Sequence, residues 1–130
     1  SFTLLARDGQ DAERWNMLHP TEDARLPYIT QCLKDTTGPI VGSTDYMRTF
    51  AEQVRAFIPK DRSYKVLGTD GFGRSDSRAK LREFFEVNRY FVVIAALKSL
   101  ADEGALSASV VAQAIAKYGI NADKPNPVTV

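Results

Sequence analysis

The residues best suited to chemistry lie in one short stretch, Tyr64–Arg78. The run Tyr64–Leu67 reads as a buried strand. It is followed by a turn with three glycines, Gly68–Gly73, and then by a polar segment, Ser75–Ser77, that would begin a helix. In α/β proteins, a strand that passes through a glycine-rich turn into a helix N-terminus is a common place to bind a phosphate or carboxylate. The stretch is therefore a candidate anion site, with a purely structural corner as the alternative.

The spacing of this turn resembles two nucleotide-binding motifs and satisfies neither. Gly68–Ser75 has the spacing of a P-loop, but Arg74 stands at the position of the lysine. That lysine reaches the β and γ phosphates, and the forked guanidinium of arginine is not equivalent to it. The dinucleotide fingerprint would need Gly or Ala at Asp76, whose carboxylate would repel a pyrophosphate. The sequence thus predicts no nucleotide site here.

Two roles for the turn remain, and both use the same residues. The glycines, including Gly71 and Gly73, would permit positive φ in a tight strand-to-helix turn. Asp70 would accept hydrogen bonds from the backbone or from an arginine within it. Arg74 and Arg78 could hold a small anion at the start of the helix. We therefore expect either an anion site or a contact with another domain at this turn.

The remaining reactive residue types do not complete a catalytic or metal site. His19 is the only histidine and has no neighbouring Cys or carboxylate cluster, which favours a structural or surface role. Cys32 lacks a nearby His or second Cys, which favours a partly buried thiol over a nucleophile. Glu83 and Glu86 are expected on a solvated helix face. Residue by residue, the sequence predicts no catalytic constellation.

Apolar spacing and capping residues predict the helices that position this turn. Gly9 is expected to end a first helix and Asp11 to cap a second. The segment 46–58 carries apolar residues three and four apart, after a cap at Thr44 or Asp45, and Pro59 ends it. Further helices are expected over 28–33, where Pro27 suits the first turn, and over 77–85.

The last third of the chain is predicted to be helical as well. Asn88 can cap and Gly104 can close a helix that is apolar nearly all round, so we expect that helix to be buried. Ser107 caps the final helix, and Gly119 followed by Ile120 indicates a Schellman ending with its hydrophobic contact. Residues 121–130 contain two prolines and are predicted to form an extended strap over the surface.

Two segments have the character of strands, Ile40–Ser43 and Tyr64–Leu67. Alternation of strands and helices favours an α/β fold with a mostly parallel sheet flanked by helices. Such a sheet normally has more strands than two. We therefore expect residues 1–130 to be the later part of a domain, incomplete at its N-terminus, with the first strands before Ser1. Such a piece would either associate or expose an apolar sheet edge.

The composition of the chain argues against nucleic acid and membranes as partners. Its 17 basic and 16 acidic residues give a net charge of +1, without the basic stripe that nucleic-acid binding needs. The longest strongly apolar run is much shorter than the roughly 20 residues that cross a bilayer, and no signal peptide is visible. A single cysteine suits a reducing compartment. We expect a cytoplasmic protein with neither nucleic acid nor membrane as a partner.

Three segments, in this order and spacing, resemble one enzyme family: Leu5–Pro20, Ser43–Pro59 and Leu67–Val87. With the ending AIAKYGINADKPNP, they are similar to the C-terminal part of the homodimeric bacterial pyruvate dehydrogenases, the thiamine-dependent decarboxylating component of their complex. The resemblance covers essentially the whole chain. The wider relatives are the transketolase-like enzymes, whose third domain is a three-layer α/β sandwich. The resemblance implies that fold here.

The resemblance also implies an activity for a longer protein. The family decarboxylates pyruvate on thiamine diphosphate and passes the acetyl unit to a lipoyl group of the dihydrolipoyl acetyltransferase. The diphosphate and Mg²⁺ lie in the first domain and the activating glutamate in the second, and GTDG at Gly68–Gly71 is not the family's metal motif. The implication for this chain is a structural, dimer-supporting role with no catalytic, cofactor or metal residue of its own.

Overall fold

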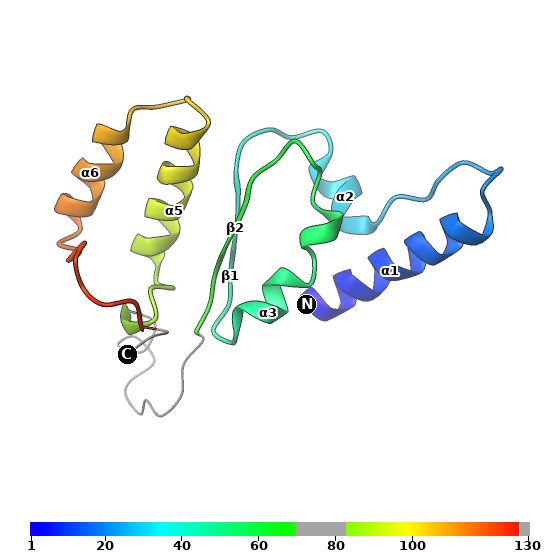
Figure 1. Cartoon of the computed structure of the whole chain (residues 1–130), viewed down its shortest axis with the longest axis horizontal. Coiled ribbons are helices and arrows are strands. Elements are labelled where there is room, and N and C mark those ends of the chain that lie inside the picture. The colour runs from blue at the N-terminus through cyan, green and yellow to red at the C-terminus, as the bar shows by residue number, and fades with distance from the viewer. Residues whose placement is uncertain (70–82, 128–130) are drawn as a thin grey trace.

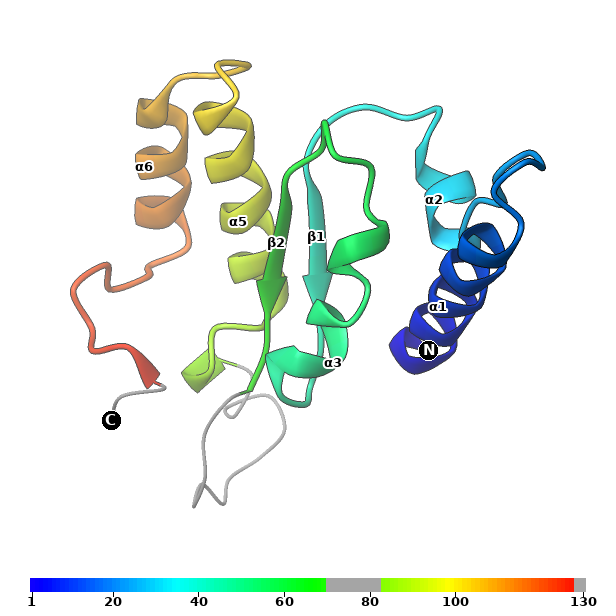
Figure 2. The ribbon, with the colours of Figure 1, turned by 45° about the vertical axis from the view of Figure 1, so that its right-hand side comes forward.

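The computed structural model describes residues 1–69 and 83–127. The elements are α1 (Phe2–Leu18), α2 (Tyr28–Leu33), β1 (Ile40–Ser43), α3 (Arg48–Glu52), the 3-10 helix η1 (Arg55–Phe57), β2 (Tyr64–Leu67), α5 (Arg89–Asp102) and α6 (Ala108–Lys117). Figures 1 and 2 show the two strands in the middle, with α5 and α6 on one side and α3 and α1 on the other. The predicted α/β arrangement of helices around a parallel sheet is confirmed.

The sheet consists of β1 and β2, paired in parallel from Ile40 opposite Tyr64 to Ser43 opposite Leu67. Hydrogen bonds extend the ladder at both ends: the Ile40 N–H donates to Ser63 O at 2.9 Å and the Thr44 N–H to Leu67 O at 3.0 Å. Both predicted strands are confirmed. The connection between them carries α3 and η1, which cover one face of the sheet, while α5 covers the other.

The core lies where this connection packs on the strands. Its buried apolar side chains include Ala51, Val54, Phe57, Ile58, Val66 and Leu67. Of the apolar face predicted for 46–58, the second half is buried as expected, whereas Tyr46, Met47 and Phe50 are 71%, 48% and 39% exposed. A single helix beginning at Thr44 or Asp45 is also wrong. The Thr44 N–H is bound by Leu67 O, and Tyr46 O accepts the Thr69 N–H at 2.8 Å. These bonds hold the chain beside β2, so α3 begins only after Met47.

The first helix differs most from its prediction. α1 continues through Gly9 and Asp11, so the predicted stop and the predicted second cap are both wrong. Gly9 is buried in the middle of the helix, and a Cβ built on it would lie 2.5 Å from the ring of Phe57. Glycine is present here because α1 and η1 approach closely, not because the helix ends.

The two C-terminal helices begin and end where predicted, although the side chain of Ser107 makes no capping hydrogen bond to α6. The Asn88 side chain accepts the N–H groups of Tyr90 and Phe91, both at 3.1 Å, and so caps α5. After α6, Gly119 has φ 65° and the Ile120 N–H donates to Ile115 O at 3.1 Å, which is the Schellman bond.

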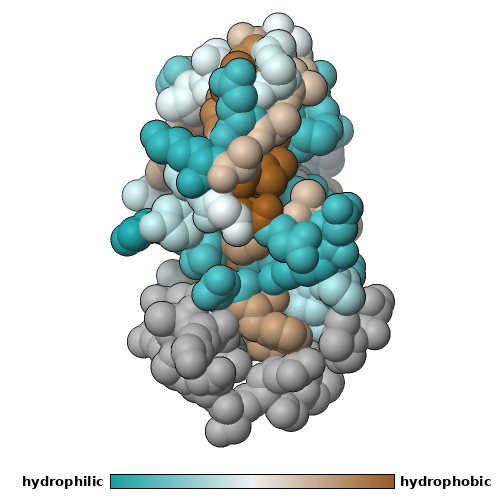
Figure 3. Space-filling view, turned by 90° about the vertical axis from the view of Figure 1, so that its left-hand side faces the viewer, coloured by the Kyte–Doolittle hydropathy of each residue, from teal (hydrophilic) through white to brown (hydrophobic). Residues whose placement is uncertain are grey.

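The predicted burial of α5 is wrong: no residue of this helix is buried, and Tyr90 and Val93 are 36% and 38% exposed. A sheet of two strands and one neighbouring helix, α6, cannot cover a helix that is apolar on most sides. Figure 3 shows that apolar side chains reach the surface on the α6 side of the molecule. In the described part of the chain, no helix is long and apolar enough to span a membrane.

Candidate functional site at the carboxyl end of the sheet

Residues with polar groups follow both strands at the carboxyl end of the sheet, where parallel α/β sheets usually bind ligands. β1 runs into Thr44 and Asp45, and β2 runs into Gly68 and Thr69. The Thr69 hydroxyl donates to Asp45 O at 2.6 Å, and the Thr69 N–H donates to Tyr46 O. The two segments therefore leave the sheet tied together, which fixes the start of the glycine-rich turn.

Gly68 has a different role from the one its sequence context predicts. It is not among the residues with positive φ, so the φ argument is wrong at this position. A Cβ built on it would lie 2.8 Å from the backbone N of Arg48 and 3.0 Å from its Cα. The first turn of α3 crosses directly over Gly68, and this close approach requires glycine.

A cavity of about 620 Å³ opens at the same end of the sheet. Its described lining residues are Ser43, Thr44, Asp45, Glu83, Val87, Asn88, Arg89 and Tyr90. The charges are mixed, with carboxylates on Asp45 and Glu83 and a guanidinium on Arg89. The Arg89 guanidinium donates to the Tyr90 hydroxyl at 2.9 Å, and this bond raises the pKa of Arg89. The cavity is polar, but among its described residues a single cation faces two carboxylates.

The residues predicted for the anion or domain contact are Asp70, Gly71, Gly73, Arg74 and Arg78. They lie in 70–82, outside the described residues, as do the rest of the P-loop-like spacing and most of the helix predicted over 77–85. Their role stays a prediction. The structure contributes the frame around them, because the turn leaves from Thr69 and returns at Glu83 beside the cavity.

A second concavity, of about 490 Å³, follows β1 on the opposite side of the molecule from α6. It is lined by Phe2, Leu5, Tyr28, Ile29, Cys32, Leu33, Val54, Ile58, Tyr64 and all of β1. Apolar residues of α1 and α2 line it together with the residues of β1. Its surface suits the packing of another apolar segment rather than chemistry.

Comparison with known proteins decides the family. The transketolase-like C-terminal domain family matches residues 1–88 of this chain. The chain belongs to that family. It is 60% identical over all 130 residues to the pyruvate dehydrogenase E1 component of Cupriavidus necator. Over 98% of the chain, it is 63% identical to that of Escherichia coli K12 and 57% identical to that of Pseudomonas aeruginosa. The resemblance seen in the sequence is confirmed.

This transketolase-like chain spans 14% of the length of each of these three relatives. It corresponds to their C-terminal part. The relatives carry the name of an oxidoreductase, whereas the described residues of this chain contain no group of three His, Cys, Asp or Glu that could hold a metal ion.

His19 has a structural role in the transketolase-like domain. Its Nδ1 lies 2.8 Å from Trp15 O, and its ring stacks on the Trp15 ring with centroids 4.2 Å apart. The Arg25 guanidinium lies 3.8 Å from the centroid of the same indole ring. Asn16 completes the arrangement, because its side chain exchanges two hydrogen bonds with the backbone of Arg25. These contacts close the loop after α1.

Two other sequence predictions are corrected. Cys32 is exposed rather than partly buried, and it lines the apolar groove from the short helix α2. Its side-chain hydrogen bond with Tyr28 raises the pKa of that tyrosine. Glu86 is not on a helix face: its φ is 63°, and its carboxylate lies 3.6 Å from the ammonium of Lys124. Sequence reasoning missed Lys124, since no motif links the tail to residue 86.

Proposed function

We propose that this chain is the structural, dimer-supporting C-terminal portion of a pyruvate dehydrogenase decarboxylating component. The observation that carries the proposal is the 60% identity over all 130 residues to a pyruvate dehydrogenase E1 component. The described structure supports it, because the apolar groove along β1 and the apolar surface on the α6 side could pack against further protein. We expect the chain by itself to be inactive.

The full-length protein would decarboxylate pyruvate on thiamine diphosphate with Mg²⁺, and pass the acetyl unit to the lipoyl group of a dihydrolipoyl acetyltransferase. The described residues of the cavity do not fit that cofactor. The carboxyl-end cavity presents Asp45 and Glu83, which would repel a diphosphate, and the side chain of Asn88 already binds N–H groups at the start of α5. We therefore assign the cofactor to other domains and no chemical step to this chain.

Residues 1–130 would form the later part of a C-terminal domain rather than a whole one. In the parallel ladder, Ile40, Gly42 and Thr44 face β2 with their N–H groups, so those of Val41 and Ser43 face the other way. Backbone donors and acceptors of a sheet require partners once they are buried. The apolar groove along this edge supports an extended segment of the same polypeptide as that partner.

One substitution in the full-length protein tests this arrangement. Val41→Pro removes an outward N–H and leaves the bonds from β1 to β2 in place, whereas Val41→Ala keeps the N–H and serves as the control. We expect Val41→Pro to lower dimer content in light scattering, together with CO₂ release from pyruvate. A Val41→Pro protein that assembles and reacts like the Val41→Ala control would refute pairing at this edge.

The function itself is tested by titration and turnover. The full-length protein should release CO₂ from pyruvate when thiamine diphosphate and Mg²⁺ are supplied, and the 130-residue chain should not bind the cofactor in calorimetry. Tight binding of thiamine diphosphate to the chain alone would contradict a purely structural role. As part of such an enzyme, the protein would be cytoplasmic, with neither nucleic acid nor membrane as a partner.

The alternative function is a stand-alone binding domain that holds a small anion at the turn between Gly68 and Ser77. In the cavity beside that turn, Arg89 supports this alternative, whereas the carboxylates of Asp45 and Glu83 in the same wall oppose it. Inorganic phosphate is a suitable probe. Saturable binding that disappears in Arg74→Ala would favour this alternative, and the absence of binding would remove it.

A further inference from the structure

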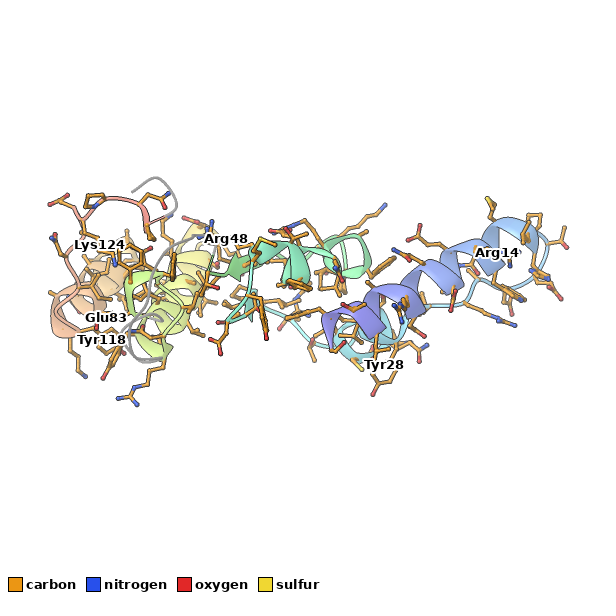
Figure 4. The ribbon with its side chains drawn as sticks, turned by 90° about the horizontal axis from the view of Figure 1, so that it is seen from below. Arg14, Tyr28, Arg48, Glu83, Tyr118 and Lys124 are labelled. Atoms are coloured by element: carbon orange, nitrogen blue, oxygen red, sulfur yellow. The ribbon has the colours of Figure 1, made fainter. Side chains whose placement is uncertain are left out.

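The C-terminal tail runs back across the residues that lead into α5, and Lys124 makes its central contact. The ammonium donates to the carbonyl oxygens of Glu83 and Phe84, both at 3.3 Å, and lies 3.6 Å from the Glu86 carboxylate. It also lies 6.0 Å and 5.5 Å from the ring centroids of Phe84 and Phe91. Figure 4 shows Lys124 and Glu83 together at the α6 end of the molecule.

The backbone on each side of this contact is shaped to make it. Glu86 has φ 63°, a conformation that costs a non-glycine residue about 1 kcal/mol or more and persists only where its surroundings hold it. On the tail, the Asn121 side chain accepts the Asp123 N–H at 3.0 Å and stabilises the turn that presents Lys124. Pro127 is buried, which anchors the tail beyond the contact. Both the segment around Glu86 and the tail that carries Lys124 are therefore held in the positions that this contact needs.

We propose that residues 121–127 are a latch that holds the 83–87 turn against α5, and that Lys124 closes it. This turn contributes Glu83 and Val87 to the wall of the carboxyl-end cavity, so the tail sets the position of that wall. Lys124 is a positioning residue for the cavity. The inference goes beyond the proposed function, since it depends only on contacts within this chain.

The strength of the latch comes from charge-assisted bonds in a half-buried place. The Lys124 side chain is 28% exposed and that of Glu86 34% exposed, so water screens the pair only in part. The two carbonyl groups have no net charge, yet they bind an ammonium more strongly than a neutral donor. Replacing the ammonium by an apolar end should therefore release the turn.

Amide hydrogen exchange in the full-length protein tests the latch. Lys124→Met preserves the length and apolar stem of the side chain, and Lys117→Met, at an exposed lysine of α6, is the matched control. We expect exchange over residues 83–91 to become about tenfold faster in Lys124→Met, as the loss of hydrogen bonds to a charged group implies. The control should leave it unchanged, and Lys124→Arg should retain most of the protection.

A double-mutant cycle with Glu86→Gln completes the test. If the two side chains act on one another, Glu86→Gln should accelerate exchange less in the Lys124→Met background than in the wild type. Equal exchange over 83–91 in the wild type and Lys124→Met would overturn the proposal. So would an acceleration spread evenly over α1 and α6, or strict additivity in the cycle. If Lys124→Met does not fold, Glu86→Gln decides alone: faster exchange over 83–91 supports the latch, and unchanged exchange overturns it.

Discussion

Substitution of Gly9 is an informative test, because a larger residue would favour the helix but would clash with the ring of Phe57. Gly9→Ala would gain about 1 kcal/mol from the higher helix propensity of alanine in the middle of α1. The new methyl group would lie 2.5 to 2.6 Å from three atoms of the Phe57 ring, whereas carbon atoms pack at about 3.5–4.0 Å. Overpacking of a core typically costs about 1–3 kcal/mol. Phe57 is only 7% exposed and has little room to move, so we expect a net destabilisation of about 1 kcal/mol.

Native-state amide exchange of α1 measures this effect locally, where 1 kcal/mol appears as about a fivefold faster opening. Gln10→Ala, at an exposed neighbouring position in the same helix, controls for propensity alone. Adding Phe57→Leu to Gly9→Ala should remove the clash and reveal a coupling free energy of about 1–3 kcal/mol. The reasoning would be refuted by a Gly9→Ala protein in which α1 is more stable by the full propensity gain, because the ring would then have moved aside freely.

Three further predictions concern single side chains. Arg62 donates to carbonyl oxygens of residues 33, 36, 37 and 38, so Arg62→Lys, which lacks the fork, should cost about 1.5–3 kcal/mol and expose that loop to faster exchange or proteolysis. Asn88→Ala should weaken α5 by about 1 kcal/mol, seen in the exchange of the amides of Tyr90 and Phe91, whereas Asn88→Asp should keep the cap. Burial raises the pKa of Tyr64 above 10.0, and the charge of Glu52 adds to the rise. Folding therefore favours the protonated phenol. The stability that this group contributes is fully present below about pH 10 and is lost as the pH rises through the raised pKa. Tyr64→Phe should lose the 2.8 Å bond to Ala51 O at neutral pH and also lose that alkaline decline, which unfolding at about pH 8 and about pH 11 would compare.

The parts of the fold that the sequence predicted well are those set by local chemistry. Asn88 caps α5 and Gly119 ends α6 because side-chain oxygens and positive φ act within a few residues. The segment Tyr64–Leu67 formed its predicted strand, and the parallel pairing followed from the helical connection. Such features depend little on the rest of the protein.

The errors arose where distant segments meet. From the sequence alone, Gly9 is typical of a helix end. Its contact with the ring of Phe57, which is far away in the sequence, explains why a glycine lies inside α1. The late start of α3 depends on bonds from Thr44 and Tyr46 to the residues after β2. The burial expected for α5 needs more protein than the described residues provide.

The location of the candidate site was predictable from the sequence, but only some of the residues that form it were. The carboxyl end of the sheet follows from the strand assignments, and polar groups do gather there. The contact of Lys124 with residues 83–86 could not be predicted, because no local pattern indicates that the tail folds back onto this segment. Family membership came from whole segments rather than from any single motif.

The close fit of Gly42 and Tyr64 has an evolutionary consequence. The phenol of Tyr64 passes over Gly42 to donate to Ala51 O, and a Cβ at position 42 would lie 2.5 Å from its oxygen. A side chain on one strand thus occupies the space that the other strand leaves empty. Natural relatives should therefore change the two positions together: where residue 42 is larger than glycine, residue 64 should be smaller than tyrosine, and the carbonyl of residue 51 should have found another donor.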